Sequence, residues 1–337
     1  MKMRQHVTIK EVAKQAGVSV TTVSRYLNGR YERMSAATKE KVAATIKKLN
    51  YAPAASARRM RQDQSHLVGL LVGDVGNPFS TMLAKGVYDV LQPAGYDVLL
   101  MNTDDSTATE ARALNRLYAQ QVDGIIVQPS AKDFAQYQPA IDAGIPLVVV
   151  DREVPNQPLD VGKVTSPNLT ACYDLGCRLA ARGYQNIISV SAQYAEASGQ
   201  IPRMAGLKAA AARTGINYLN LATQKRTDQA TLADQLQKWV TSLRGKTVIV
   251  SLMGPVLFDL LAIFQNLNWH FPQDVGLVSY DDWAWSRFVG DGICLVKQDM
   301  ETMGNLAAQN LLKQIAAGTT RSATNFVPVE FIDAPSI

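Results

Sequence analysis

The chain has 337 residues, which is enough for two or more domains, and its hydrophobic content of 47% is ordinary for a globular protein. No apolar run reaches the roughly 18 residues of a membrane span, so we expect no membrane partner. Residues 1–65 hold 14 Lys and Arg against 4 Asp and Glu, a net charge of +10, whereas residues 66–337 carry −5. This asymmetry indicates a nucleic-acid-binding module on a second domain, although a solvated basic face would give the same count.

Two short helices are expected near the N-terminus. Thr8 and Glu11 have the spacing of a capping box. An apolar stripe at helical spacing follows, formed by Ile9, Val12, Ala13 and Ala16. Gly17 permits a left-handed turn, and Ser19 caps a second helix that directs Val23 and Leu27 inward. The pattern predicts a helix-turn-helix, with an ordinary helical hairpin as the alternative.

A third helix is expected from about residue 35 to 49, capped by Ser35, and the sequence Asn-Tyr-Ala-Pro at 50–53 ends it. Residues 54–61 are small on one side and basic on the other. They are too few to hold a helix alone in water, so they form either a plain linker or a hinge that folds on a partner. We therefore expect a helix-turn-helix domain at 1–53, a hinge at 54–65 and a body at 66–337.

Strand and helix patterns alternate throughout the body. Strands are expected at 67–72, 96–101, 124–127, 146–150, 186–190, 247–251 and 275–280. Helices are expected at 78–94, 108–121, 135–143 and 203–214. This alternation predicts doubly wound parallel sheets in two similar lobes with a cleft between them. Ligands bind beyond the carboxyl ends of such strands.

Enzyme and cofactor motifs are missing from the sequence. It contains no Gly-x-Ser-x-Gly elbow, phosphate loop, His-Glu-x-x-His or Gly-x-Gly-x-x-Gly, and the paired acids at 104–105 and 281–282 have no obvious partner base. The cysteines and histidines lack metal-site spacing: Cys172, Cys177, Cys294, His6, His66 and His270. We expect no catalytic residues, no metal, no cofactor and reduced thiols. Since no signal peptide precedes the first helix, we expect a cytoplasmic protein.

The chain resembles the lactose/galactose-repressor (LacI/GalR) family of bacterial transcription regulators over nearly its whole length. The matching segments are 7–29, 38–42, 49–53, 77–79, 149–152, 203–206, 276–282 and 297–299. The resemblance implies an α + α/β protein: a three-helix helix-turn-helix domain and hinge, followed by a two-lobed periplasmic-binding-protein-like body. Lobe 1 would span about 66–163 and 299–323, and lobe 2 about 164–298 and 324–337.

The resemblance also implies a homodimer on double-stranded operator DNA. Val20, Thr21 and Arg25, at the start of the second helix, would read base edges. Polar side chains around them would contact phosphates: Thr8, Ser19, Thr22, Ser24 and Asn28. Simple solvent exposure is the alternative for each of these residues. The hinge residues would enter the minor groove: Ala57, Arg58 and Met60, with Met60 where the family usually has a Leu wedge.

An effector would bind in the cleft and change the affinity for DNA. Its expected contacts are Phe79, Gln128, Asp151, Arg152, Arg203, Asp281, Trp283 and Trp285. The aspartates would accept hydroxyl groups and Arg203 would bind a carboxylate or a hydroxyl pair. Arg152 would add a second positive charge or pair with Glu153 at the rim. The tryptophans would either stack on a sugar or pack in the wall.

Two departures from the family pattern bear on function. Leu252-Met253-Gly254 replaces an Asn-Asp pair that contacts sugar. This loss argues against an unmodified neutral sugar. Together with the positive charges of Arg152 and Arg203, it favours an anionic sugar derivative, with a sugar acid as the first choice and a sugar phosphate as the second. The sequence ends at Ile337 without a heptad segment, so no tetramerisation helix is expected. We expect a repressor of carbohydrate or sugar-acid utilisation genes; the alternative is a stand-alone intracellular sugar-binding protein without operator specificity.

Overall fold

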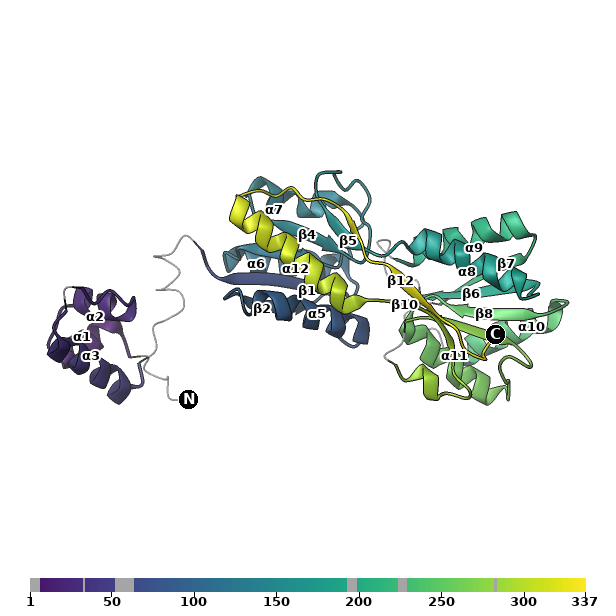
Figure 1. Cartoon of the computed structure of the whole chain (residues 1–337), viewed down its shortest axis with the longest axis horizontal. Coiled ribbons are helices and arrows are strands. Elements are labelled where there is room, and N and C mark those ends of the chain that lie inside the picture. Colours follow the sequence, from purple (N-terminus) through teal and green to yellow (C-terminus); the bar gives the residue numbers. More distant parts are fainter. Residues whose placement is uncertain (1–6, 33, 52–63, 193–198, 224–228, 282–283) are drawn as a thin grey trace. The chain divides into compact units, whose positions relative to one another are not determined.

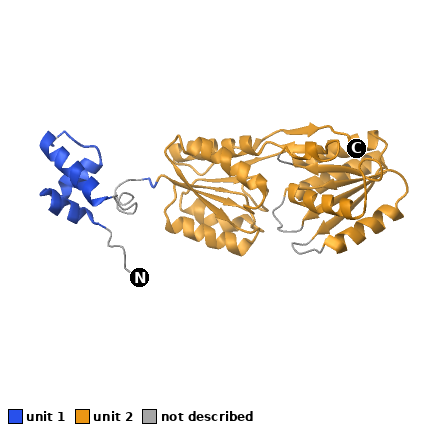
Figure 2. Ribbon diagram, turned by 90° about the horizontal axis from the view of Figure 1, so that it is seen from below, with its two compact units in different colours: residues 1–65 blue, residues 66–337 orange. Residues whose placement is uncertain are grey.

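The computed structural model describes residues 7–32, 34–51, 64–192, 199–223, 229–281 and 284–337. The chain divides into two compact units, residues 1–65 and 66–337 (Figure 2). The expected hinge contacts Ala57, Arg58 and Met60 lie outside the described residues, as does Trp283.

The described residues of the first unit form three helices, α1 (Ile9–Ala16), α2 (Val20–Leu27) and α3 (Ala36–Leu49). The capping box is confirmed, because Thr8 Oγ1 accepts from the Glu11 backbone N at 3.3 Å and the Glu11 carboxylate accepts from the Thr8 N at 2.6 Å. Gly17 has φ 61°, so the turn to α2 uses the left-handed conformation that glycine tolerates. The three helices bury a common core of Val12, Ala13, Ala16, Val23 and Val42.

Two capped helices of this unit begin with the same local geometry. Ser19 Oγ accepts from the Thr22 backbone N at 3.1 Å at the start of α2. Ser35 Oγ accepts from the Thr38 backbone N at 3.2 Å at the start of α3. Each bond satisfies a backbone donor that has no partner within its helix, which explains why both helices start where the sequence predicted.

The second unit has two lobes, each built on one six-stranded sheet (Figure 1). The first sheet has the order β11-β5-β4-β3-β1-β2, from Asn325–Phe326, Lys163–Thr165, Leu147–Val150, Gly124–Val127, Leu67–Val72 and Asp97–Asn102. The second has the order β12-β10-β9-β8-β6-β7, from Val329–Ile332, Cys294–Gln298, Gly276–Tyr280, Thr247–Ser251, Asn186–Ala192 and Asn217–Thr223. Every strand pair is parallel except β10 with β12.

Helices cover both faces of each sheet. One face of the first sheet packs against α5 (Pro78–Leu91) and α12 (Met300–Ala317), and the other against α6 (Thr107–Ala119), η1 (Phe134–Tyr137) and α7 (Gln138–Asp142). One face of the second sheet packs against α10 (Gln229–Ser242) and α11 (Gly254–Asn266), and the other against α8 (Asn168–Ala181) and α9 (Gln200–Thr214). A short η2 (Ser286–Phe288) follows β9. The predicted fold class is confirmed.

Several boundaries differ from the sequence prediction. The helix expected to 94 ends at Leu91, the one expected at 135–143 starts as η1, and the one expected from 203 starts at Gln200. Strands β5 and β11 pair with each other in the first sheet, so the chain crosses between lobes a few residues after the expected positions near 163 and 323. These strands have three and two residues, too short to show a hydrophobic period.

Candidate functional site

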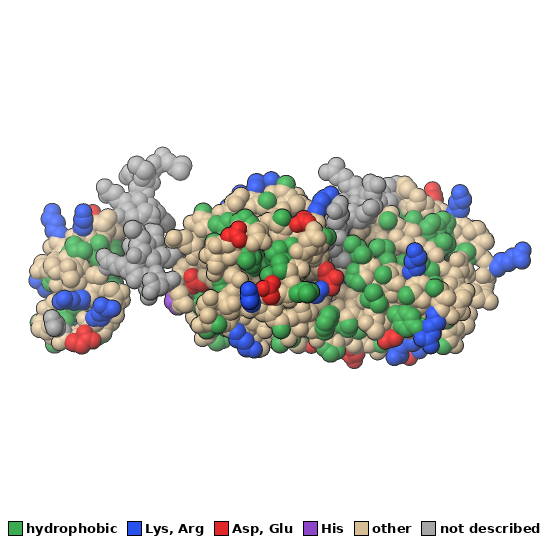
Figure 3. Space-filling view, turned by 90° about the horizontal axis from the view of Figure 1, so that it is seen from above, with side chains coloured by type: hydrophobic (Ala, Val, Ile, Leu, Met, Phe, Trp, Pro, Cys, Tyr) green, Lys and Arg blue, Asp and Glu red, His purple; other side chains and the backbone are tan. Residues whose placement is uncertain are grey.

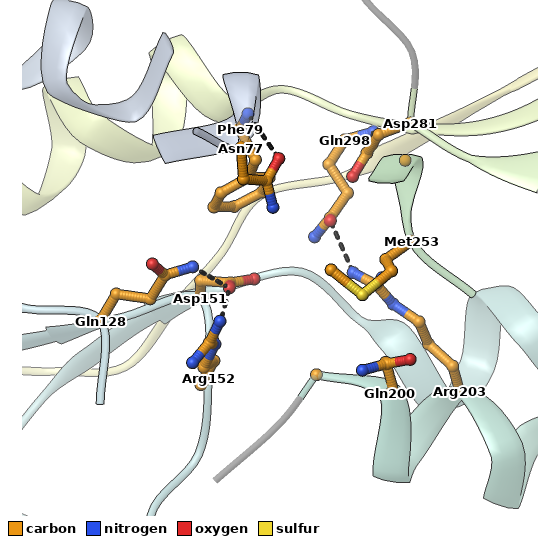
Figure 4. Close-up of a pocket in the computed structure, with 12 residues that line it drawn as sticks. Asn77, Phe79, Gln128, Asp151, Arg152, Gln200, Arg203, Met253, Asp281 and Gln298 are labelled. Carbon is orange, nitrogen blue, oxygen red and sulfur yellow. Dashed lines mark hydrogen bonds and ion pairs between the residues drawn. The ribbon is translucent and has the colours of Figure 1, made fainter. Parts of the chain in front are cut away.

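A pocket lies between the two lobes of the second unit, at the carboxyl ends of the parallel strands (Figure 4). The empty space among its lining residues is about 450 Å³ and includes open solvent. The first lobe contributes Asn77, Phe79, Gln128, Asp151 and Arg152. The second contributes Gly199, Gln200, Arg203, Met253, Gly254, Asp281 and Gln298. Six residues that the sequence placed in an effector site therefore line one cavity: Phe79, Gln128, Asp151, Arg152, Arg203 and Asp281.

Asp151 is positioned by a neighbouring amide on the first-lobe wall. It follows β4 directly, its side chain is 9% exposed and its backbone φ is 66°. Gln128 Nε2 donates to Asp151 Oδ2 at 2.8 Å, while Gln128 Oε1 accepts from the Gly73 N at 2.8 Å. Both polar atoms of the Gln128 amide thus bond to protein, and the role of this side chain is to orient the aspartate.

Asp281 is buried on the second-lobe wall, directly after β9, with φ 55°. Its Oδ1 accepts from the Gln298 backbone N at 2.7 Å. The Gln298 side chain points from the end of β10 into the pocket, where its Oε1 accepts from Arg203 and its buried Nε2 has no hydrogen-bond partner within the described part of the chain. A buried amide donor left without a partner is costly, so a ligand acceptor would satisfy it.

Arg152 is held between two carboxylates. Its Nη1 donates to Asp105 Oδ1 at 2.5 Å, and its Nε lies 3.8 Å from Asp151 Oδ2. Glu153, the partner considered from the sequence, instead forms an ion pair with Lys163. Two nearby negative charges oppose the single charge of Arg152, so this residue does not give the pocket an excess of positive charge.

Arg203 has only neutral hydrogen-bond partners in the described residues. Its Nε donates to Asn168 Oδ1 at 2.9 Å, its Nη1 to the Leu252 carbonyl at 2.6 Å and its Nη2 to Gln298 Oε1 at 2.6 Å. The guanidinium carbon lies 3.7 Å from the centre of the Tyr280 ring, and the residue is 5% exposed. The side chain is rigidly placed at the pocket while its charge has no carboxylate partner there.

Two helices of the second lobe begin at the pocket. Gly199 and Gln200 form the start of α9, and Met253 and Gly254 form the start of α11. Among the described residues, no side chain forms a capping hydrogen bond at the N-terminus of either helix. Helix N-termini carry partial positive charge and point backbone N–H groups outward, which suits an anion. The second-lobe wall is therefore the more electropositive one.

The apolar residues of the site divide between pocket and core. Met253 lines the pocket, whereas the Leu252 side chain is fully buried in the core. Trp285, named among the expected effector contacts, follows the packing alternative: its side chain is not among the pocket-lining residues and stacks on Phe258, with ring centres 4.8 Å apart, against the core of the second lobe. The tryptophan thus packs in the wall of the second lobe.

Several lining residues were not among the named effector contacts: Asn77, Gly199, Gln200, Met253, Gly254 and Gln298. Asn77 and Gln298 lie inside the quoted family segments, which was the available signal. The Gln200 amide bonds to the Ala192 backbone N and O, both at 2.8 Å, and so joins the start of α9 to the end of β6. No sequence pattern indicates that contact.

The first unit presents a candidate nucleic-acid surface on α2. Val20, Thr21 and Arg25 are exposed, as expected for side chains that read bases. Thr8, Ser19 and Asn28 are also exposed, and Thr22 and Ser24 are half-buried. All described Lys and Arg side chains of this unit are exposed: Lys10, Lys14, Arg25, Arg30, Lys39, Lys41, Lys47 and Lys48. Figure 3 shows Lys and Arg side chains on one face of this unit.

Comparison with known proteins finds a family model for each of the two units. Residues 8–54 match the sequence model of bacterial regulatory proteins of the lacI family, and residues 65–334 match that of periplasmic binding proteins and the sugar-binding domain of the LacI family. The chain belongs to the LacI family. Like other LacI-family members, it is a DNA-binding transcriptional regulator with a body of the sugar-binding type. No helix within the described residues has the length and apolar character needed to cross a membrane.

Individual relatives match nearly end to end. The chain is 30% identical to the HTH-type transcriptional regulator KdgR of Bacillus subtilis, covering 92% of this chain and 91% of the relative. It is 32% identical to the ribose operon repressor of Lactococcus lactis, covering 98% of each. A solved structure of the Lac repressor dimer bound to operator and the anti-inducer ONPF superposes with a TM-score of 0.81 at 21% identity, over 98% of this chain and 99% of that one. This last match supports the fold.

Proposed function

We propose that this regulator is a cytoplasmic repressor of carbohydrate or sugar-acid utilisation genes and binds a pseudo-palindromic operator as a homodimer. The relative described as a ribose operon repressor supports repression, and the Lac repressor dimer on its operator supports the two-fold arrangement. In each protomer, Val20, Thr21 and Arg25 read bases. An effector in the pocket between the lobes controls the affinity for DNA by changing how the lobes close.

The effector is a sugar acid, and the uncompensated charge of Arg203 is the observation that carries this proposal. Within the described part of the chain, the guanidinium bonds to neutral acceptors only, and no side chain caps the starts of α9 and α11 at the same wall. A single carboxylate at this wall gains charge-assisted hydrogen bonds. The sequence suggested two arginines that could bind an anionic effector. Only Arg203 remains available for this, because Arg152 is paired with Asp105.

The opposite end of the effector carries hydroxyl groups. Asp151, oriented by Gln128, accepts hydroxyl protons from the first-lobe wall, and Phe79 and Met253 supply apolar contact. A carboxylate placed near Asp151 would be repelled. At the second-lobe wall Asp281 is also negative, but its Oδ1 already accepts from the Gln298 N and Arg203 lies at the same wall, so the acid binds with its carboxylate at Arg203. Among the described lining residues there is no Ser, Cys, Lys or His, which supports binding without chemical conversion.

Titration calorimetry with gluconate, 2-keto-3-deoxygluconate and the neutral alcohol glucitol tests the effector class. The parent binds at least one acid more tightly than glucitol, and Arg203→Ala loses roughly 10- to 100-fold for the acid with little change for glucitol. Lys208→Ala, which removes an exposed charge from the same helix, leaves both affinities unchanged. Equal losses for acid and alcohol, or tighter binding of neutral sugars by the parent, reject the sugar-acid effector.

A further inference from the structure

Asp105 reaches the pocket region by an unusual backbone path between β2 and α6. Asp104 and Asp105 are consecutive residues with left-handed backbones, φ 53° and 51°. The Asp105 N donates to the Gly73 carbonyl at 2.9 Å. A Cβ atom at Gly73 would lie 2.3 Å from Asp105 Oδ1 and 2.8 Å from Arg152 Nη2, so only glycine leaves room for this ion pair. The loop geometry therefore serves to bring the Asp105 carboxylate to Arg152.

The pair is nearly removed from solvent, with side-chain exposures of 12% for Arg152 and 10% for Asp105. Arg152 lines the pocket, and Asp105 lies behind it rather than in the lining. With Asp151 at 3.8 Å, the three side chains have a net charge of −1. Because charges that are shielded from water are screened weakly, this end of the pocket repels anions.

We propose that Asp105 is a specificity-determining residue that acts through Arg152 and excludes a second anionic group from the first-lobe end of the pocket. The inference rests on the proposed sugar-acid effector, whose carboxylate occupies the second-lobe end at Arg203. A sugar acid that carries a phosphate at its far end would place that phosphate against Asp105 and Asp151. The regulator consequently responds to the unphosphorylated acid and rejects its phosphorylated form.

Three variants separate the charge of Asp105 from its structural role. Asp105→Asn keeps the size of the side chain and an acceptor for Arg152 but removes the negative charge. Arg152→Gln leaves that negative charge uncompensated. The double variant removes both charges together. Calorimetry on the full chain gives the ratio of the Kd for 6-phosphogluconate to the Kd for gluconate, with glucitol as the neutral reference and thermal melts as the check on folding.

In the parent the ratio is well above one. Asp105→Asn lowers it roughly tenfold and Arg152→Gln raises it, while the double variant returns close to the parent value. Glucitol affinity in Asp105→Asn stays within about threefold of the parent value, a result that a merely structural role of Asp105 would not produce. If Asp105→Asn fails to fold, the Kd ratios of Arg152→Gln and the double variant still test the proposal, because the ratio should rise in the first and return to the parent value in the second. If the Kd ratio of the double variant is as high as that of Arg152→Gln, then Arg152 contacts the anion directly and the proposal is overturned.

The two proposals fail differently. A parent that binds neither gluconate nor 2-keto-3-deoxygluconate better than glucitol contradicts the sugar-acid effector. Equal affinities of parent and Asp105→Asn for 6-phosphogluconate, including a shared lack of binding, overturn the role of Asp105 whatever the parent does with gluconate.

Discussion

Asp151 and Asp281 occupy the same position in the two lobes. Each is the first residue after the third strand in the order of its sheet, β4 or β9, and each has a left-handed backbone, with φ 66° and 55°. Asp adopts this conformation more readily than most residues, and the resulting turn ends the strand and sends the carboxylate toward the pocket. A ligand between the lobes thus meets one fixed carboxylate from each side, which couples binding to the relative position of the lobes.

Asp151→Asn is expected to weaken sugar-acid binding by roughly 10- to 100-fold, since an ionised acceptor of hydroxyl protons is replaced by a neutral amide. Asn tolerates the left-handed backbone, and its Oδ1 can still accept from Gln128, so the fold should persist. Calorimetry measures the affinity, and Asp97→Asn, at an exposed position on β2, is the matched control. An unchanged affinity in Asp151→Asn would remove this residue from the site.

The parts of the structure that the sequence predicted well depend on local signals. Thr8, Gly17, Ser19 and Ser35 define the helices of the first unit through contacts a few residues apart. The central strands of the body are continuous apolar runs buried on both faces, as β3 and β4 show. For these elements, helix-capping residues and hydrophobic runs are enough to predict the secondary structure from the sequence.

The parts that the sequence missed depend on contacts between distant residues. Asp105 and Arg152 are 47 positions apart, and Arg203 and Gln298 are 95 apart. Whether an arginine at a strand end is available to a ligand depends on such partners, which no single-chain pattern reveals. The same applies to Trp285, since only the fold shows that Phe258 lies beneath its ring.

Arg25→Ala is expected to cost about 1–3 kcal/mol of specific binding and to relax selectivity at one base position, because a bidentate contact to guanine is lost. Fluorescence anisotropy against an operator selected from a random pool, and against its single-base variants, measures both effects. Arg30→Ala, exposed beyond the end of α2, should weaken binding to all variants alike if it affects binding at all. A variant of Arg25 that retained the parent's ranking of operators would show that Arg25 does not read a base.

Ser19→Ala and Ser35→Ala form a matched pair. Both remove a helix cap with the same geometry, so each should destabilise the first unit by about 1 kcal/mol. Only Ser19 lies at the start of α2, where we propose a phosphate contact, so only Ser19→Ala should also reduce DNA affinity and the salt dependence of binding. Circular dichroism melts and anisotropy at several salt concentrations compare them. Equal DNA affinities in the two variants would assign Ser19 to capping alone.

Glu110 should make the stability of the body depend on pH. Its carboxylate is fully buried and accepts from the Ser130 N and from the Tyr137 hydroxyl, both at 2.6 Å. Burial raises the pKa of Glu110 above its usual value of 4.5, although these hydrogen bonds oppose the shift. The folded state therefore binds the proton more tightly than the unfolded state. The free energy of unfolding from this group falls as pH rises from about 4.5 through the raised pKa, and levels off above it.

Glu110→Gln removes this titration, so its urea midpoint should vary less with pH over that interval than the parent's. All four tryptophans lie in residues 66–337, so intrinsic fluorescence follows unfolding of the body. Glu330→Gln, which neutralises an exposed carboxylate on β12, should keep the pH dependence of the parent. Parallel pH profiles for the parent and Glu110→Gln would show that the buried carboxylate does not titrate with folding, and the slope would then belong to other groups.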